Sequence, residues 1–172
     1  SDHGYHMGEH GHFQKTTLFE NSDRVPLIIA GPGVTARGQV HKGMAEMVDF
    51  YPTLAALCGV KPPRGLPGVS LGPVLVDVSQ PVRTSALTQY STGYSLRTER
   101  YRYTEWGPDG SAGAELYDRD SDPEELVNLA NADRSGEVRV RLSKMLRKRI
   151  AKAKKKPAGL TQIQFKNRRR VK

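Results

Sequence analysis

The sequence predicts an α/β fold: the end of a larger covered sheet, followed by a small antiparallel sheet with helices. The run VPLIIAGPGV, residues 25–34, is continuously apolar and closed by Gly-Pro-Gly, which is typical of a strand covered on both faces. From residue 84 onward, short β-forming segments alternate with turn signals, and apolar residues then recur at helical spacing. Because one covered strand cannot build a sheet alone, we expect the chain to be the C-terminal part of a longer protein.

The segment VDFYPTLAALCG, residues 48–59, predicts an amphipathic helix. Asp49 can cap its N-terminus, Pro52 falls in the first turn, and Gly59 can end it. Four side chains recur at helical spacing, namely Phe50, Leu54, Leu57 and Cys58. We therefore expect Cys58 on the buried face of this helix, in a structural role.

The segments that follow predict an antiparallel unit. TSALTQY, YSLRTE, YRYTEW and AELYDR indicate a meander of about four strands. In DSDPEELVNLA, residues 120–130, Asp122 as N-cap and Glu125 three residues later form a capping-box pattern, which predicts a short helix. A last helix should follow, with one apolar stripe made by Val138, Leu142, Met145, Leu146 and Ile150.

Charge is distributed unevenly along the 172 residues. Residues 135–172 hold 15 of the 27 Lys and Arg but one of the 18 Asp and Glu, so the net charge of +9 arises from this segment. Past Lys154 the apolar periodicity ends, and we expect residues 154–172 to be a basic, mobile tail. No apolar run approaches the ~20 residues of a membrane span. With Cys58 as the single cysteine, an internal disulfide is excluded.

The opening SDHGYHMGEHGHFQK, residues 1–15, contains all but one of the five histidines. They are interleaved with glycine and acidic residues, unlike an affinity tag. Imidazole and carboxylate together suit divalent cations, and Gly4 allows the turn through which adjacent Asp2 and His3 could reach one ion. Two adjacent ligands do not fill a coordination sphere, so spacing alone favours a metal or anion site only slightly over a polar loop.

In chain order, SDHGYHMGEHGHFQK, VPLIIAGPG, VDFYPTLAALCGV, RTERYRYTEW and ELYDRDSDPEELVNLA resemble C-terminal landmarks of the type I sulfatases, most closely the iduronate-2-sulfatase-like group. The resemblance runs from Ser1 to about residue 131. It implies the end of an alkaline-phosphatase-like sandwich followed by a small antiparallel sheet with helices. Residues 1–83 would then be the C-terminal part of the catalytic domain and residues 84–153 a C-terminal subdomain.

The resemblance also implies roles for four residues. Asp2 and His3 match the pair that binds the active-site divalent ion, usually calcium, although imidazole is a less usual calcium ligand than an oxygen donor. Lys15 matches the lysine that contacts the sulfate ester, where a compact ammonium can neutralise charge on the sulfuryl and leaving oxygens. His10 lies in GEHG, where substrate contact and bracing of the loop are equally open.

The nucleophile of the family, a formylglycine made from Cys or Ser in a C-x-P-x-R-type motif, is not found in these residues. Cys58 stands in CGVKP, which lacks Pro and Arg at the required places. We therefore expect the nucleophile and the other metal-binding acids upstream, and this chain alone to be inactive. By resemblance, the complete protein would hydrolyse a sulfate ester of a small molecule or polysaccharide, on a uronic acid or another sugar, and would be periplasmic or secreted.

Two other functions stay open. Phosphonate and phosphate ester hydrolases of the same superfamily keep a similar Asp-His-Gly loop and downstream Lys. The chain could also be a non-catalytic module whose basic tail binds polyanions. For the tail, an inert extension ranks first, tethering to a sulfated polysaccharide second and nucleic acid third, because Phe165 is its only aromatic residue.

The remaining notable side chains receive structural interpretations. Arg97 is expected to lie exposed on a strand, and Glu124 and Glu125 to favour a helix N-terminus. The aromatic and imidazole groups are assigned to cross-strand packing (Tyr101, Tyr103, Trp106), to loop positions (His6, His12) and to the surface (His41).

Overall fold

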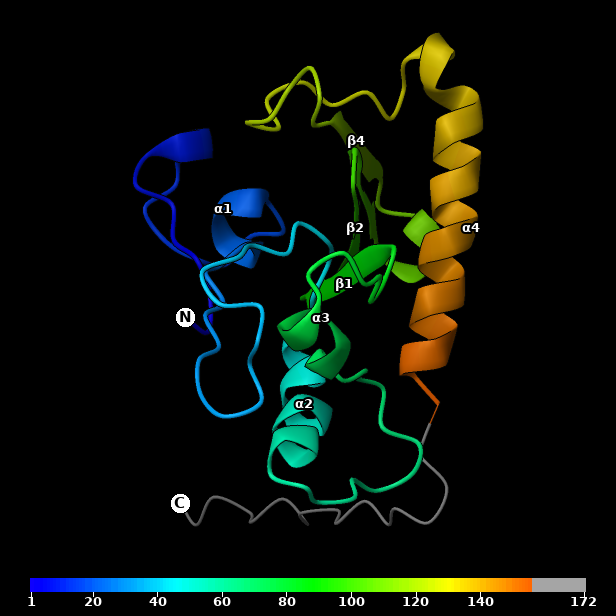
Figure 1. Ribbon diagram of the computed structural model, residues 1–172. Helices are drawn as coiled ribbons and strands as arrows, with labels where there is room; N and C mark the ends of the chain where they lie inside the picture. The colour runs from blue at the N-terminus through cyan, green and yellow to red at the C-terminus, as the bar shows by residue number, and fades with distance from the viewer. Residues whose placement is uncertain (156–172) are drawn as a thin grey trace, which may run out of the picture.

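The computed structural model describes residues 1–155 (Figure 1). Its helices are α1 (Glu20–Asp23), α2 (Phe50–Leu57), α3 (Gly72–Val76) and α4 (Gly136–Ala153), and its strands are β1 (Ser85–Tyr90), β2 (Gly93–Thr98), β3 (Tyr101–Trp106) and β4 (Ala114–Asp118). Short 3-10 turns are η1 (Glu9–Gly11), η2 (Met47–Asp49), η3 (Pro108–Gly110) and η4 (Asp133–Ser135). Most of the tail predicted at residues 154–172 lies outside the described residues.

The strands form one antiparallel sheet in the order β1-β2-β3-β4, which confirms the predicted meander. Gly93 begins β2 directly opposite Trp106 of β3. A Cβ at Gly93 would stand 2.6 Å from the indole ring, so a larger residue would displace Trp106. The predicted cross-strand packing of the aromatic residues is therefore confirmed at this end of the sheet.

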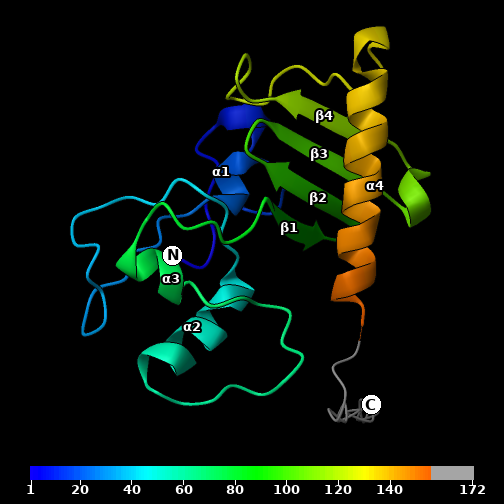
Figure 2. The ribbon, with the colours of Figure 1, turned by 45° about the vertical axis from the view of Figure 1, so that its right-hand side comes forward.

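The apolar core lies between the sheet and α4, which crosses one face of the sheet (Figure 2). Leu96, Tyr103 and Leu116 stand opposite one another on β2, β3 and β4. Leu142 and Leu146 of α4 pack on them and are completely buried, which confirms the predicted apolar stripe. Because full burial of one such side chain contributes about 1.5–3 kcal/mol, this contact anchors α4.

The other face of the sheet carries a charged network beside aromatic side chains. Side chains alternate along β3, so Arg102 points away from α4 when its neighbour Tyr103 points toward it. Arg102 reaches Glu20 and Asp23 of α1. The sheet therefore separates an apolar interface with α4 from a charged interface with α1.

The strand predicted at residues 25–34 is wrong. The backbone there is irregular and pairs with no strand of the described sheet. Ile28 is 87% exposed and Leu27 is 42% exposed. A strand requires a hydrogen-bonded neighbour as well as an apolar composition, and within residues 1–155 the meander does not supply one to this segment.

The helix predicted at residues 120–130 is also wrong. Asp122 does accept hydrogen bonds from two backbone N–H groups, those of Leu126 (3.1 Å) and Val127 (2.8 Å). However, Glu125 has a φ of 58°, which is incompatible with a right-handed helix. Its buried carboxylate pairs with Arg102, and this distant contact outweighs the local capping pattern.

Helix α2 forms where expected, but its buried face differs from the prediction. Asp49 makes no side-chain cap to α2 and pairs instead with Arg83. Thr53 is buried, and its hydroxyl donates to the Asp49 carbonyl (2.5 Å) and accepts from the Leu71 N–H (2.8 Å). Cys58 is exposed at the end of the helix, so its predicted burial is wrong because these polar contacts orient the helix.

Glu46 connects the segments on either side of residue 83. Its carboxylate accepts the Leu87 N–H at 2.6 Å, contacts Arg83 at 2.8 Å and pairs with Arg149 of α4. The domain boundary after residue 83 stays a prediction.

None of the helices in residues 1–155 combines the length and apolar character needed to cross a membrane.

Candidate functional site

The N-terminal loop, residues 1–19, folds back on itself and lies against α1 (Figure 1). Gly4 N–H donates to the carbonyl of Ser22 in α1 at 2.8 Å. A Cβ at Gly4 would stand 1.8 Å from the carbonyl oxygen of Asn21. Only glycine permits so close an approach, so Gly4 fixes the position of the neighbouring Asp2 and His3.

Asp2, His3 and Lys15 come together at the open end of this loop. Lys15 Nζ lies 2.7 Å from His3 Nε2, and Asp2 Oδ2 lies 3.6 Å from the same nitrogen. His3 Nδ1 lies 2.8 Å from the Gly4 carbonyl oxygen. Because a carbonyl only accepts, we assign the hydrogen to Nδ1, which leaves a lone pair on Nε2 to accept from the Lys15 ammonium.

These donor atoms fit a shared divalent cation. An Nε2 lone pair and a carboxylate oxygen 3.6 Å apart can both reach an ion at about 2.0–2.5 Å. The pKa of Asp2 lies below its usual value, first because its own backbone N–H donates to the carboxylate and then because His3 is close. Within residues 1–155 no group of three His, Cys, Asp or Glu residues is arranged to hold a metal ion, so Asp2 and His3 could supply only part of a coordination sphere.

His10 lies against the aromatic side chain of Phe19. The two rings stack with centroids 3.8 Å apart and planes 6° apart. The Phe19 ring in turn packs against the ring of Tyr117 in β4, with 5.8 Å between the centroids. This series of contacts braces the N-terminal loop on the sheet. Direct contact of His10 with a substrate stays a prediction.

His6 has a larger structural role than its position in a loop indicates. It is completely buried, with Nε2 2.7 Å from Thr17 Oγ1 and Nδ1 3.2 Å from the Glu9 carbonyl oxygen. Thr17 Oγ1 also lies 2.8 Å from Ser22 Oγ. Burial lowers the pKa of His6, so the neutral imidazole is favoured. No local pattern distinguishes His6 from the half-buried histidines of the same loop, His3, His10 and His12.

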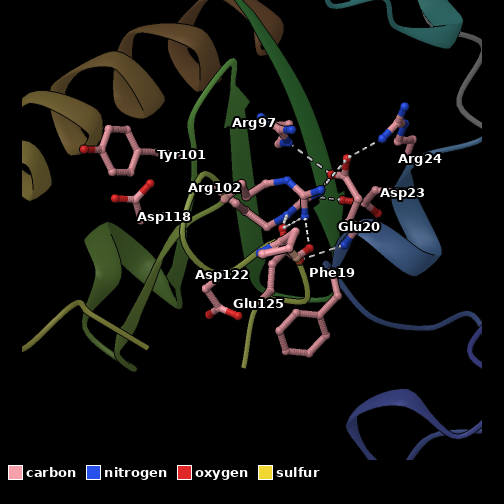
Figure 3. A network of polar contacts seen from close by, with 12 residues as sticks. Phe19, Glu20, Asp23, Arg24, Arg97, Tyr101, Arg102, Asp118, Asp122 and Glu125 are labelled. Atoms are coloured by element: carbon pink, nitrogen blue, oxygen red, sulfur yellow. Dashed lines mark hydrogen bonds and ion pairs between the residues drawn. The ribbon is translucent and has the colours of Figure 1, made fainter. Parts of the chain in front are cut away.

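Arg102 holds α1 against the sheet (Figure 3). Its guanidinium is buried, with Nε 2.7 Å from Glu125 Oε1. Nη1 and Nη2 lie 3.0 Å from Asp23 Oδ2 and 2.5 Å from Glu20 Oε2. Arg119 pairs with the two glutamates as well. A buried guanidinium is tolerated only when paired, so these contacts tie the segment that follows the N-terminal loop to the sheet.

Arg97 belongs to the same network, and its predicted exposure is wrong. It stands directly opposite Arg102 in the sheet register, an arrangement that is unfavourable for two like charges. Glu20 resolves this repulsion because the same oxygen, Oε2, lies 3.1 Å from Arg97 Nε and 2.5 Å from Arg102 Nη2. The role predicted for Glu125, support of a helix N-terminus, is wrong for the same reason: its partners are distant arginines.

The network shifts the pKa values of the two acids of α1, Glu20 and Asp23, in opposite directions. Burial raises the pKa of Asp23 to about 6, although Arg102 acts against the shift. Burial also acts to raise the pKa of Glu20, but Arg102, Arg97 and Arg119 outweigh it, and the pKa lies below its usual value. One short helix therefore carries one carboxylate held ionised and one that takes up a proton in mildly acidic solution.

Solved structures share this fold. The structure of BT4656 in complex with its substrate D-glucosamine-2-N,6-O-disulfate matches with a TM-score of 0.82 and 28% identity, covering 90% of this chain and 33% of that chain. The phosphonate monoester hydrolase of Agrobacterium radiobacter matches with a TM-score of 0.78 and 28% identity, covering 88% and 34%. The predicted fold class is confirmed: the end of an alkaline-phosphatase-like sandwich followed by a small antiparallel sheet with helices.

The sequence comparison identifies the family. Residues 8–153 match the family described as N-sulphoglucosamine sulphohydrolase, C-terminal, and the chain belongs to this family of sulfatase C-terminal parts. Arylsulfatase K of Homo sapiens is 33% identical over 143 residues, which cover 76% of this chain and 26% of the relative. A sulfatase of Formosa agariphila is 36% identical over 132 residues, covering 76% and 25%. The chain spans about a quarter of the length of these relatives.

Proposed function

We propose that the complete protein is a sulfatase that hydrolyses a sulfate ester of a sugar or uronic acid, closest to the iduronate-2-sulfatase-like group. The observation that carries the proposal is the convergence of Asp2, His3 and Lys15 in a chain of a sulfatase family. The substrate of BT4656, D-glucosamine-2-N,6-O-disulfate, supports a sulfated sugar as the substrate class. In this proposal the formylglycine nucleophile lies in a part of the protein outside these residues.

Each residue of the loop has a separate task in this proposal. Asp2 and His3 Nε2 hold part of the coordination sphere of a divalent cation, assigned as calcium. When bound, such a cation supplies positive charge beside the sulfuryl oxygens. Lys15 Nζ, which donates to His3 Nε2 in this structure, turns toward the ester and neutralises charge on the sulfuryl and leaving oxygens. His10 orients the loop through its stack on Phe19 and, in this proposal, contacts the substrate.

A phosphonate or phosphate ester hydrolase is the alternative, because the phosphonate monoester hydrolase of Agrobacterium radiobacter shares the fold with a TM-score of 0.78. An ammonium and a divalent cation would serve either tetrahedral ester. The location proposed from the family, periplasmic or secreted, applies to both enzymes.

The test compares the complete protein with a Lys15→Ala variant on sulfate, phosphonate and phosphate esters of one aryl alcohol. We expect kcat/KM for the sulfate ester to fall by about 10²–10³ in the variant, the range for removing one transition-state donor. Lys42→Ala removes another exposed lysine and should leave the rate unchanged. Faster turnover of the phosphonate or phosphate ester would favour the alternative, and an unaffected Lys15→Ala variant would refute the role of Lys15.

Metal binding gives a second measurement. Titration of the complete protein with Ca²⁺ should show weaker binding in Asp2→Asn than in the unaltered protein, because an amide replaces a carboxylate ligand. The isolated chain of 172 residues should bind the ion more weakly still and should turn over none of the three esters. Sulfatase activity of this chain alone would contradict the assignment of the nucleophile to another part of the protein.

A further inference from the structure

One flank of α4 carries a continuous row of cations. Arg141, Lys144, Lys148 and Lys152 are separated by three, four and four positions, and Lys155 follows three positions later. On a helix these spacings place side chains one above another, so Arg141, Lys144, Lys148 and Lys152 form a single row about 17 Å long. Lys155 follows two residues beyond the end of α4. All five are exposed, and we call them the cationic row.

The cationic row does not contribute to the packing of α4. Within residues 1–155 the structure shows no side-chain hydrogen bond or ion pair of these five residues. The other arginines of α4 differ: Arg139 donates to the Ala130 carbonyl, Arg147 pairs with Glu105, and Arg149 pairs with Glu46. The helix is held by its apolar stripe and by these two ion pairs, both on other sides of the helix.

Placing like charges at these spacings disfavours the helix. Residues three and four positions apart on a helix are neighbours, and like charges there repel. The only acid of α4, Glu137, lies at the opposite end of the row from Lys155 and compensates little of this repulsion. The helix dipole favours a cation in the last turn, which accounts for Lys152, but Arg141 and Lys144 lie too far from that end to gain from it. Their placement in the row therefore points to a ligand of opposite charge.

We propose that the cationic row is a docking surface for a sulfated polysaccharide chain. A linear polyanion matches a linear row of cations, and the helix offers no aromatic side chain on which nucleic acid bases could stack. The choice of a sulfated polysaccharide over other polyanions rests on the proposed function. The assignment of the row as a polyanion-binding surface does not. The row lies on α4, across the sheet from α1 and the N-terminal loop, so docking there leaves the candidate active site free (Figure 2).

The test uses two variants of the complete protein with the same change in net charge. The row variant carries four replacements: Arg141→Gln, Lys144→Gln, Lys148→Gln and Lys152→Gln. The control variant removes four exposed cations elsewhere: Arg37→Gln, Lys42→Gln, Lys61→Gln and Arg64→Gln. The residues beyond Lys155 are the same in all three proteins, so any binding through them is unchanged.

Affinity for a heparin oligosaccharide is measured across a range of salt concentrations, with duplex DNA of equal charge as comparator. We expect the row variant to bind heparin at least about tenfold more weakly, and its slope of log affinity against log salt to fall by about three. The control variant should lose less than about threefold. Thermal unfolding should occur at the same or a higher temperature in the row variant, because repulsion along the helix is relieved.

Three results would overturn the proposal. Equal losses in both variants would mean that only net charge matters, and an unchanged row variant would mean that heparin binds elsewhere. Tighter binding to DNA than to heparin, lost in the row variant, would assign the surface to nucleic acid.

Turnover of a small aryl sulfate should be unchanged in the row variant. If the unaltered protein fails to hydrolyse that ester, the proposed function fails, while heparin docking is still decided by the two variants.

Discussion

Glu125 shows how one buried residue can decide the path of a whole segment. Its carboxylate contacts Arg102 at 2.7 Å and Arg119 at 3.0 Å, and it accepts the Glu20 N–H at 2.8 Å. Glu125→Gln would keep the shape of the side chain but leave Arg102 without one of its anionic partners. Breaking such a buried pair costs about 3–5 kcal/mol, so we expect a loss of that order in the free energy of unfolding, measured by urea denaturation.

Glu124→Gln provides the control, because Glu124 is the exposed neighbour of Glu125 with the same chemistry. Its effect on the free energy of unfolding should lie within about 0.5 kcal/mol. Equal effects of the two substitutions would show that the ion pairs of Glu125 do not stabilise the fold.

Asp23 gives a prediction about pH. Its pKa is raised to about 6, so between this value and 3.8 the folded state binds a proton that the unfolded state does not. Asp23 therefore adds stability as the pH falls through this window, whereas Glu20, with a lowered pKa, loses its contribution below pH 4.5. Titration of the side-chain carboxyl carbons by NMR should show midpoints near pH 6 for Asp23 and below 4.5 for Glu20. The reverse order would contradict this account of the network.

At the scale of elements, the N-terminal loop depends on the hydrogen bonds of His6. Thr17→Val would keep the side-chain volume and remove the hydroxyl that lies 2.7 Å from His6 Nε2. A buried nitrogen without a partner costs about 1–3 kcal/mol, so we expect local destabilisation, seen as faster hydrogen exchange of the Gly4 and His6 amides. Thr16→Val, at an exposed adjacent position, should leave both exchange rates unchanged.

The elements that the sequence predicts correctly are those stabilised by contacts with a regular period. The meander and α4 bury side chains at spacings of two or of three and four, and this spacing is visible locally. Segment 25–34 needed a neighbouring strand. Segment 120–130 was decided by the buried carboxylate of Glu125, which contacts Arg102 and accepts the Glu20 N–H. Neither requirement leaves a local pattern.

The candidate site was predictable to a similar degree. Asp2, His3 and Lys15 belong to a recognisable motif, and the structure brings them together. Arg102 carried no such signal, because its importance comes from the pairing of α1 with the sheet. His6 was missed because burial of a single imidazole depends on how the loop closes rather than on its neighbours in sequence.

At the scale of the whole molecule, some apolar side chains are buried in the core and others are exposed on the surface. Leu142 is completely buried between α4 and the sheet, whereas Ile28 is 87% exposed. Leu142→Ala should therefore lower the free energy of unfolding of the 172-residue chain by about 2–5 kcal/mol. Ile28→Ala should change it by less than about 0.5 kcal/mol, because little surface is buried at that position. Urea denaturation of both variants under one condition measures the difference. A cost for Ile28→Ala comparable to that for Leu142→Ala would mean that residues 25–34 are buried, as a covered strand would be.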